Sequence, residues 1–316
     1  WIILFHYTTR YDALIGHEVP FDIFFTHGGY YGVVMFFVIS GYFVPQSLDR
    51  LGGAIDSVKW LYRKVVRLYP AYLVAVPLIY LICSYSEFAQ FKVSFVTYVV
   101  NQFLIYHPKV RFVEGAHWYI AALFLFNLFS IVLYNLRFFK FKYSWIFVVL
   151  LVMLLHLLWM RYPDNMVLLK IGQWTFTPYY LAYLAGIFIK KHQNDKSIVF
   201  LLLVLLYVVF DIYISRSIYL VVLMPVFYYL TYKATVQHDV LTFKSSHISN
   251  TISYISACTY AWYLIHQRIG YVIIHELERV CSSEFVILIV PIIATFIIAV
   301  LIHQFEVWFS RKIIQR

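Results

Sequence analysis

Three histidines lie in or beside apolar stretches of this sequence: His6, His117 and His266. An ionisable group within a membrane span is costly, so each is a candidate for function. A histidine in a poorly solvated pocket stays neutral and can accept a proton, which suits general-base catalysis. The alternative for each is a histidine that is simply hydrogen-bonded at a helix end. Other ionisable residues near apolar stretches are His156, Arg161, Asp211, His303 and Glu306.

The sequence contains no HExxH, no paired CxxC, no GxSxG and no Walker glycine loop. The three cysteines fit neither a disulfide framework nor a zinc site. Ser40 stands beside Gly41, and we interpret this pair, like Gly32, as a notch for close helix packing. We therefore expect no metal site and no permanently bound cofactor, and direct transfer assisted by a base if the protein is an enzyme.

The composition is typical of an integral membrane protein. Of 316 residues, 63% are hydrophobic, 21% aromatic and 13% charged, whereas about a quarter of an ordinary soluble domain is charged. The net charge of +10 would also fit a nucleic-acid-binding protein, but the basic residues stand in short clusters between apolar runs. We expect membrane lipids as surroundings and no nucleic-acid partner, and an oligomer is compatible with the sequence.

Apolar runs of about spanning length recur ten times and predict an all-α, polytopic helical bundle. The first run is too short to span and is interpreted as the end of a truncated helix that begins upstream of residue 1. No linker or repeat divides the chain, so residues 1–316 are expected to form a single transmembrane domain. The predicted spans are 1–8, 29–46, 69–86, 117–136, 143–161, 174–190, 197–214, 217–233, 251–274 and 285–309.

Two further runs, 55–67 and 94–107, are too short and too mixed to span and are expected either to lie at the membrane interface or to pack as re-entrant pieces. The first contains a basic amphipathic stretch, residues 58–67, that is expected to turn at Leu68-Tyr69-Pro70 into the next span. Such a stretch holds positive charge at a fixed depth and suits a phosphorylated ligand. The alternative is a plain positive-inside anchor.

Lysines and arginines indicate the orientation. If the segment after the second span is cytoplasmic, 16 of the 25 basic residues lie on inner segments and 9 on outer ones. This distribution predicts a multi-pass protein of the plasma or inner membrane with both termini in the cytoplasm. On this topology His6, His117 and His266 lie at similar depth towards the outer side, and the basic stretch lies inside.

Four stretches carry recognisable patterns: GVVMFFVISGYF (32–43), YRKVVRLYPAY (62–72), HWYI (117–120), and SY (253–254) with YLIHQ (263–267). In this order they resemble the landmarks of the acyltransferase-3 family, over about residues 1–270. These multi-span enzymes transfer acyl groups, usually acetyl from acetyl-CoA, to hydroxyls of cell-surface carbohydrates. The resemblance therefore implies an acyl-CoA-dependent O-acyltransferase for polysaccharide modification.

The resemblance also assigns roles to residues. His6 matches an essential histidine that follows an arginine in the family's first helix, and that arginine would fall upstream of residue 1. The family's Arg-x-x-Arg before the Tyr-Pro pair corresponds to Lys64-Val-Val-Arg67, with Arg63 one place earlier. Lysine can neutralise a phosphate but cannot make arginine's bidentate contact. The resemblance thus implies coenzyme A binding by Arg63, Lys64 and Arg67.

With His6 as the base, His117 and His266 have three candidate roles: orienting His6, binding the acceptor hydroxyl or holding the oxyanion. Trp118, Tyr119 and Tyr263 are candidates for stacking against the carbohydrate acceptor, although tryptophan and tyrosine are enriched at membrane interfaces in any case. The donor is cytosolic and His6 lies outward, so either the pantetheine arm threads into the bundle or the acyl group is relayed.

Two other function classes remain open. A transporter or flippase of a glycan or lipid-linked glycan would also have many spans and basic inner loops, and it would act without acyl-CoA. A sensor or assembly protein would tolerate loss of His6. Neither class needs one indispensable histidine together with coenzyme A binding.

Overall fold

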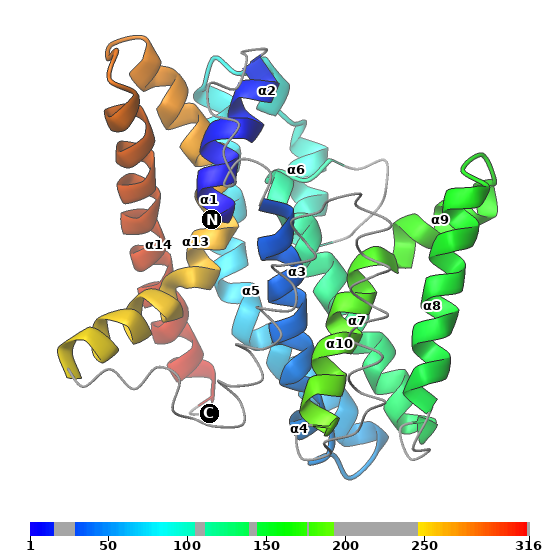
Figure 1. Cartoon of the computed structure of the whole chain (residues 1–316). Helices are drawn as coiled ribbons and strands as arrows, with labels where there is room; N and C mark the ends of the chain where they lie inside the picture. Colours follow the sequence, from blue (N-terminus) through cyan, green and yellow to red (C-terminus); the bar gives the residue numbers. More distant parts are fainter. Residues whose placement is uncertain (16–28, 105–110, 139–143, 176, 193–245, 315–316) are drawn as a thin grey trace. The chain divides into compact units, whose positions relative to one another are not determined.

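The computed structural model describes residues 1–15, 29–104, 111–138, 144–175, 177–192 and 246–314. Every regular element in these ranges is a helix (Figure 1). The all-α prediction is therefore confirmed for the described part of the chain. The predicted spans 197–214 and 217–233, with Asp211, lie outside it.

The chain forms two compact units, each assembled from separate segments. Unit 1 comprises Trp1–Val33, Val58–Ala122 and Asn250–Arg316, and unit 2 comprises Val34–Ser57 and Leu123–Ser249. All three candidate histidines belong to unit 1. The expected single domain over 1–316 stays a prediction.

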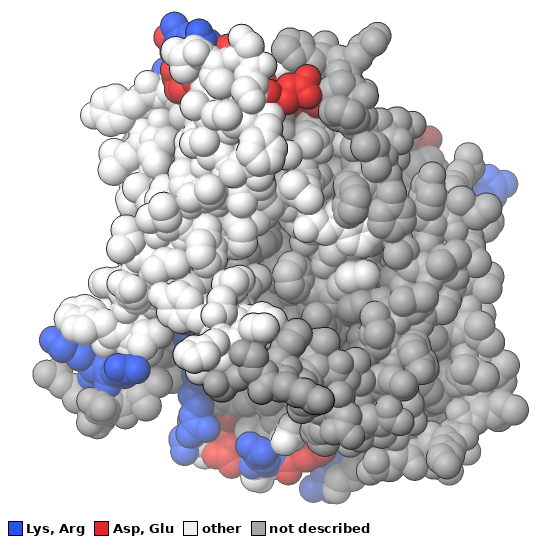
Figure 2. Space-filling view, turned by 60° about the vertical axis from the view of Figure 1, so that its left-hand side comes forward, with Lys and Arg blue, Asp and Glu red and all other residues white. Residues whose placement is uncertain are grey.

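Three helices of the described chain are long and apolar enough to cross a membrane: Ile55–Tyr85, Gly115–Asn135 and Glu284–Lys312. Shorter apolar helices cover Gly32–Leu48 and Phe147–Arg161. In Figure 2, the described surface drawn in white on the left-hand side carries charged side chains at its upper and lower ends and none between them. That distribution suits a hydrocarbon layer, and the full number of ten spans stays a prediction.

The N-terminal helix extends beyond the predicted 1–8. It begins as α1 (Ile2–Phe5), widens into a π-helical turn, η1 (His6–Arg10), and continues as α2 (Tyr11–Ile15). Turns of this kind are rare and occur frequently at functional sites. His6 is the first residue of this turn.

Helix α5 (Ala54–Tyr85) corrects one prediction. No turn occurs at Leu68-Tyr69-Pro70, because the helix passes through Pro70 and Pro77 without ending. A proline removes one helical hydrogen bond, but tertiary bonds hold this region: Tyr72 Oη donates to Asn101 O over 2.7 Å and Tyr260 Oη to Leu68 O over 2.9 Å. The basic stretch is thus the first part of one long helix.

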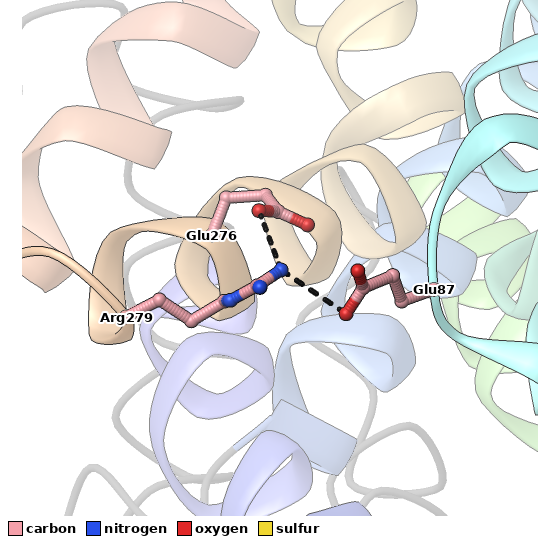
Figure 3. A network of polar contacts seen from close by, with 3 residues as sticks. All are labelled: Glu87, Glu276 and Arg279. Atoms are coloured by element: carbon pink, nitrogen blue, oxygen red, sulfur yellow. Dashed lines mark hydrogen bonds and ion pairs between the residues drawn. The ribbon is translucent and has the colours of Figure 1, made fainter.

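Helices α13 (Ser246–Glu278) and α14 (Glu284–Ile314) form a hairpin and lie side by side (Figure 1). Trp262 Nε1 donates to Thr295 Oγ1 across it over 3.0 Å. Near the turn, Arg279 pairs with Glu87 at 3.0 Å and with Glu276 at 3.5 Å (Figure 3). The hairpin fixes the helix that carries His266.

The segment between α5 and α7 (Trp118–Asn135) consists of short pieces: η2 (Ala89–Phe91), α6 (Phe95–Gln102) and η3 (Gly115–His117). The expected short helix at 94–107 corresponds to α6. Asn101 organises this segment, because its Oδ1 accepts from Val113 N over 2.9 Å and its Nδ2 donates to Arg111 O over 3.0 Å. These hydrogen bonds fix the path of the backbone that leads to His117.

Unit 2 contains most of α3 (Gly29–Tyr42), with α4 (Val44–Leu48), α8 (Ser144–Arg161), α9 (Met166–Thr175) and α10 (Thr177–His192). Helix α9 was not predicted. Helices α3 and α10 cross backbone to backbone: a Cβ on Gly41 would lie 1.9 Å from Tyr183 O, and one on Gly186 would lie 1.9 Å from Val38 O. The predicted packing notch at Gly41 is confirmed.

Candidate active site

His6 is positioned by two tyrosines on its own helical run. Tyr7 Oη donates to His266 O over 2.7 Å, and Tyr11 Oη donates to Glu278 Oε2 over 2.7 Å. The Tyr7 ring reaches α13 because residue 270 is glycine, where a Cβ would lie 2.2 Å from that ring. These contacts hold the π-helical turn against α13.

His266 lies on α13 and is 1% exposed. Its Nδ1 lies 2.8 Å from Tyr263 O. Because a backbone carbonyl only accepts hydrogen bonds, Nδ1 is the protonated nitrogen. The other nitrogen, Nε2, is buried and has no hydrogen-bond partner in the described structure.

His117 ends the 3₁₀ turn before α7 and is 0% exposed. Its Nε2 lies 2.9 Å from Leu264 O, so Nε2 carries the proton and donates. Its Nδ1 is buried with no partner among the described atoms. The ring packs against Tyr72 with a centroid distance of 5.0 Å.

The structure brings His6 and His266 together, with ring centroids 5.1 Å apart. In the described structure, His117 does not touch either ring in this way. It is hydrogen-bonded instead to the carbonyl of Leu264 on α13, two residues before His266. Of the three, only His6 is partly exposed. A substrate can therefore reach His6 without displacing a buried ring, whereas His117 and His266 support it from behind.

The hydrogen bonds also restrict what each histidine can do. The single N–H of neutral His117 and that of neutral His266 are both used on backbone carbonyls. Holding an oxyanion requires a free donor, so neither residue can donate to one without giving up its backbone bond. What each presents instead is an unprotonated nitrogen.

Trp118, Tyr119 and Tyr263 form a row of rings. Trp118 and Tyr119 meet at 6.5 Å between centroids, Tyr119 and Tyr263 at 5.5 Å, and Tyr263 and His266 at 5.8 Å. Tyr263 Oη also donates to Ala116 O. The predicted acceptor-binding residues therefore adjoin the histidines, and sugar stacking stays a prediction.

The predicted coenzyme A residues lie on the first half of α5. Arg63 and Arg67 are exposed, and Lys64 is partly buried with Nζ 4.9 Å from the centroid of the Trp60 ring. Tyr72 on the same helix touches His117. From the helical rise per residue, the three cations lie about 8 to 14 Å from Tyr72 along the axis of α5, towards its N-terminus. The cations and the histidines thus occupy different levels of unit 1.

Sequence patterns did not predict two further polar residues beside the histidines, a buried glutamate and a half-buried arginine. Glu114 is 0% exposed, and its Oε2 accepts from Arg268 N over 3.0 Å. The Arg268 guanidinium donates to Phe91 O over 2.9 Å and to Phe112 O over 3.0 Å. These hydrogen bonds clamp the segment before His117 onto α13 beside His266. The available signal was an acidic residue three positions before His117 and a basic one two positions after His266.

Burial raises the pKa of the Glu114 carboxyl to about 7, against the opposing effect of the Arg268 charge and of backbone hydrogen bonds. Its Oε1 has no partner within the described residues. Together with His117 Nδ1, His266 Nε2 and Gln267 Oε1, this makes four buried and unpaired acceptor atoms in one neighbourhood. Unpaired buried groups of this kind call for a functional explanation.

Within the described ranges, no three His, Cys, Asp or Glu side chains lie together as a metal site would require. The geometry is that of a partly exposed histidine supported by buried polar groups, which suits proton transfer rather than covalent catalysis.

Comparison with known proteins gives one match: the model of the acyltransferase 3 family, described as an acyltransferase domain, covers residues 1–304. No curated protein and no solved structure matches the chain.

Proposed function

The chain belongs to the acyltransferase 3 family and is thus a membrane acyltransferase, and from this premise we propose its reaction. It transfers an acyl group, acetyl in the first instance, from acyl-CoA to a hydroxyl of a cell-surface or lipid-linked carbohydrate, with His6 as the general base. The observation that carries this proposal is the arrangement of His6, partly exposed beside the buried His266 at 5.1 Å.

The reaction needs one proton acceptor. The acceptor hydroxyl attacks the thioester carbonyl, its proton passes to His6, the new ester C–O bond forms and the C–S bond breaks. The departing thiolate then takes the proton from His6 and leaves as coenzyme A. Because the thioester is already activated, no covalent enzyme intermediate is required.

His266 supports the charged intermediate state of His6. When His6 takes up a proton it becomes an imidazolium, which is costly in a poorly solvated pocket. The unprotonated Nε2 of His266 is an acceptor without a partner in the described chain, and the ring lies next to His6. The partial negative charge on this nitrogen, on a ring whose centroid lies 5.1 Å from that of His6, offsets part of that cost.

Arg63, Lys64 and Arg67 bind the phosphates of the donor. Fixed cations suit a ligand with several phosphate charges, and the exposed arginines need no desolvation before they bind it. Their offset of about 8 to 14 Å along α5 from the level of His117 is within half the hydrocarbon thickness, about 15 Å. An extended pantetheine arm that threads into the bundle can bridge this offset.

In this proposal the protein is a multi-pass protein of the plasma or inner membrane with cytoplasmic termini. The donor enters from the cytoplasm and the carbohydrate from outside. Trp118, Tyr119 and Tyr263 contact the acceptor, because they form a row of rings whose last member, Tyr263, adjoins His266.

The test uses purified protein, labelled acetyl-CoA and a mixture of cell-surface glycans. His6→Ala should lose transfer by at least about 100-fold and keep acetyl-CoA binding, whereas Arg67→Ala should weaken that binding about tenfold. The matched controls are His275→Ala on α13 and Arg161→Ala on α8, which should do neither. Normal transfer by His6→Ala, or no acetyl-CoA binding by the wild type, overturns the proposal and makes glycan transport the leading alternative.

A further inference from the structure

Among the described residues, His6 makes one side-chain hydrogen bond, and its partner is another side chain. Its Nδ1 lies 3.2 Å from Tyr271 Oη. Tyr271 in turn lies 3.2 Å from the amide of Gln267, one turn earlier on α13. Tyr271 is 1% and Gln267 is 9% exposed. A chain of three side chains therefore runs from α13 to the reactive imidazole, and only its His6 end is partly exposed.

This chain decides which nitrogen of His6 carries the proton. Among the described residues, Tyr271 Oη has two polar partners, His6 Nδ1 and the Gln267 amide, so its one proton is donated to one of them. If the Gln267 N–H donates to Tyr271, the tyrosine donates to His6 Nδ1, and the neutral imidazole keeps its proton on Nε2. If the Gln267 carbonyl accepts from Tyr271, the tyrosine oxygen accepts from His6 Nδ1–H, and Nε2 is left unprotonated. Only the second arrangement makes Nε2 a base.

In the structure Gln267 Nε2 is the atom nearer to Tyr271, and Gln267 Oε1 is buried without a partner. The amide lies against Gly115, where a Cβ would be 2.8 Å from Oε1 and 3.3 Å from Nε2. Beside Gly115 stands Glu114, whose Oε1 is also a buried acceptor without a donor. Each such acceptor costs about 1–3 kcal/mol.

Rotating the Gln267 amide by a half-turn exchanges its oxygen and nitrogen, and the oxygen then gains a hydrogen-bond donor. The oxygen and nitrogen of an amide exchange places at almost no steric cost, because the two ends are nearly the same size. The carbonyl then accepts the Tyr271 proton, and the oxygen of this amide is no longer a buried acceptor without a donor. Both consequences favour the arrangement that frees His6 Nε2.

We propose that Gln267 and Tyr271 are positioning residues that hold the proton of neutral His6 on Nδ1 and keep Nε2 unprotonated. The proposal rests on His6 being the base of the proposed acyl transfer. The order of hydrogen bonds is His6 Nδ1–H to Tyr271 Oη, and Tyr271 O–H to Gln267 Oε1. The relay holds the tautomer and takes no proton from the substrate.

The tautomer is measured directly by solid-state NMR of the full chain in lipid bilayers, with ¹⁵N-labelled histidine. The His6 signals are identified by their loss in His6→Gln. We expect one protonated Nδ1 and one unprotonated Nε2 in the wild type near neutral pH. Tyr271→Phe should produce a mixture of tautomers, whereas the control Tyr183→Phe, at a buried tyrosine of unit 2 that also bonds through its hydroxyl, should not. A proton on Nε2 in the wild type, or an unchanged tautomer in Tyr271→Phe, overturns the proposal.

Kinetics provide an independent readout. Tyr271→Phe and Gln267→Met should each lower kcat about tenfold, leave KM for acetyl-CoA unchanged, and together cost no more than either alone, because both break the same relay. Multiplying effects in the double variant contradict the relay. Normal transfer by His6→Ala would overturn the general-base role and leave the NMR result untouched, so the two failures are distinguishable.

Discussion

Glycine permits close approach in both units of this protein, but the result differs. In unit 2, Gly41 and Gly186 bring two helix backbones into contact, and the neighbouring interior is filled by rings such as Phe37 against Phe126 at 5.2 Å. In unit 1, Gly270 admits the ring of Tyr7, whose hydroxyl bonds to the backbone of His266. The first contact fixes a shape, and the second fixes the position of a reactive group.

The buried polar groups beside the glycine crossing and beside the histidines show the same contrast. At the crossing in unit 2, Tyr183 Oη donates to Asn127 Oδ1 over 3.3 Å and Ser130 Oγ donates to Phe126 O over 2.9 Å. In unit 1, Glu114, His117, His266 and Gln267 each keep an unpaired buried atom. Unit 1 therefore gives up hydrogen-bond satisfaction around the site where chemistry is proposed, as functional sites often do.

The largest expected effect tests the backbone crossing of unit 2. Gly41→Ala places a Cβ 1.9 Å from Tyr183 O, where backbone rather than a flexible side chain must move. We expect a loss of unfolding free energy of about 3 kcal/mol or more, measured by thermal and denaturant unfolding of the purified protein. Gly53→Ala is the control, because no atom lies within 4 Å of a Cβ there. Equal stability of the two variants would show that the crossing is not tight.

The second prediction concerns the pH dependence of unit 1. The pKa of Glu114 is raised by burial from 4.5 to about 7, so its contribution to stability is complete below about pH 4.5 and is lost as pH rises through 7. The full effect is at most about 3 kcal/mol. Glu114→Gln should therefore lose less stability than the wild type between pH 5 and pH 8.

Unfolding midpoints of both proteins across this pH range measure that difference. Glu284→Gln, at an exposed position in the first turn of α14, should retain the wild-type slope. If Glu114→Gln retains it as well, the buried carboxyl does not titrate in this range.

Arg268→Lys tests the clamp that Glu114 shares. Lysine presents a compact ammonium on a flexible stem and cannot hold the two carbonyls of Phe91 and Phe112 with a planar fork. The expected loss is about 2 kcal/mol, with slower acyl transfer because the segment before His117 loosens. Arg161→Lys at the exposed end of α8 should stay within about 0.5 kcal/mol of the wild type. A similar result for Arg268→Lys would mean that the fork is dispensable.

The smallest effect is expected at the surface network in Figure 3. Arg279, Glu87 and Glu276 have side chains 51–65% exposed, where solvent weakens ion pairs. Arg279→Ala should cost less than about 1 kcal/mol and lose its effect in high salt. A larger or salt-independent loss would place this network among the contacts that hold the α13–α14 hairpin.

The amino-acid sequence by itself determined the helical class, the boundaries of α7 and α8 to within a residue or two, and the family. Long apolar runs must form helices in lipid, and the family resemblance drawn from short motifs around His6, Arg67, His117 and His266 agrees with the family match over residues 1–304. It also predicted that Gly41 lies where two helices pack closely, because a small residue in an apolar helix allows the backbone of a neighbouring helix to approach.

Only the tertiary structure decided how these pieces act together. Pro70 predicted a turn, but hydrogen bonds from Tyr72 and Tyr260 hold α5 continuous. The π-helical turn at His6, the Glu114–Arg268 clamp and the relay through Tyr271 join residues up to 265 positions apart in sequence. Local propensity and hydrophobic period contain no information on such pairings, because a hydrogen bond between distant helices exists only once packing has set their register and rotation.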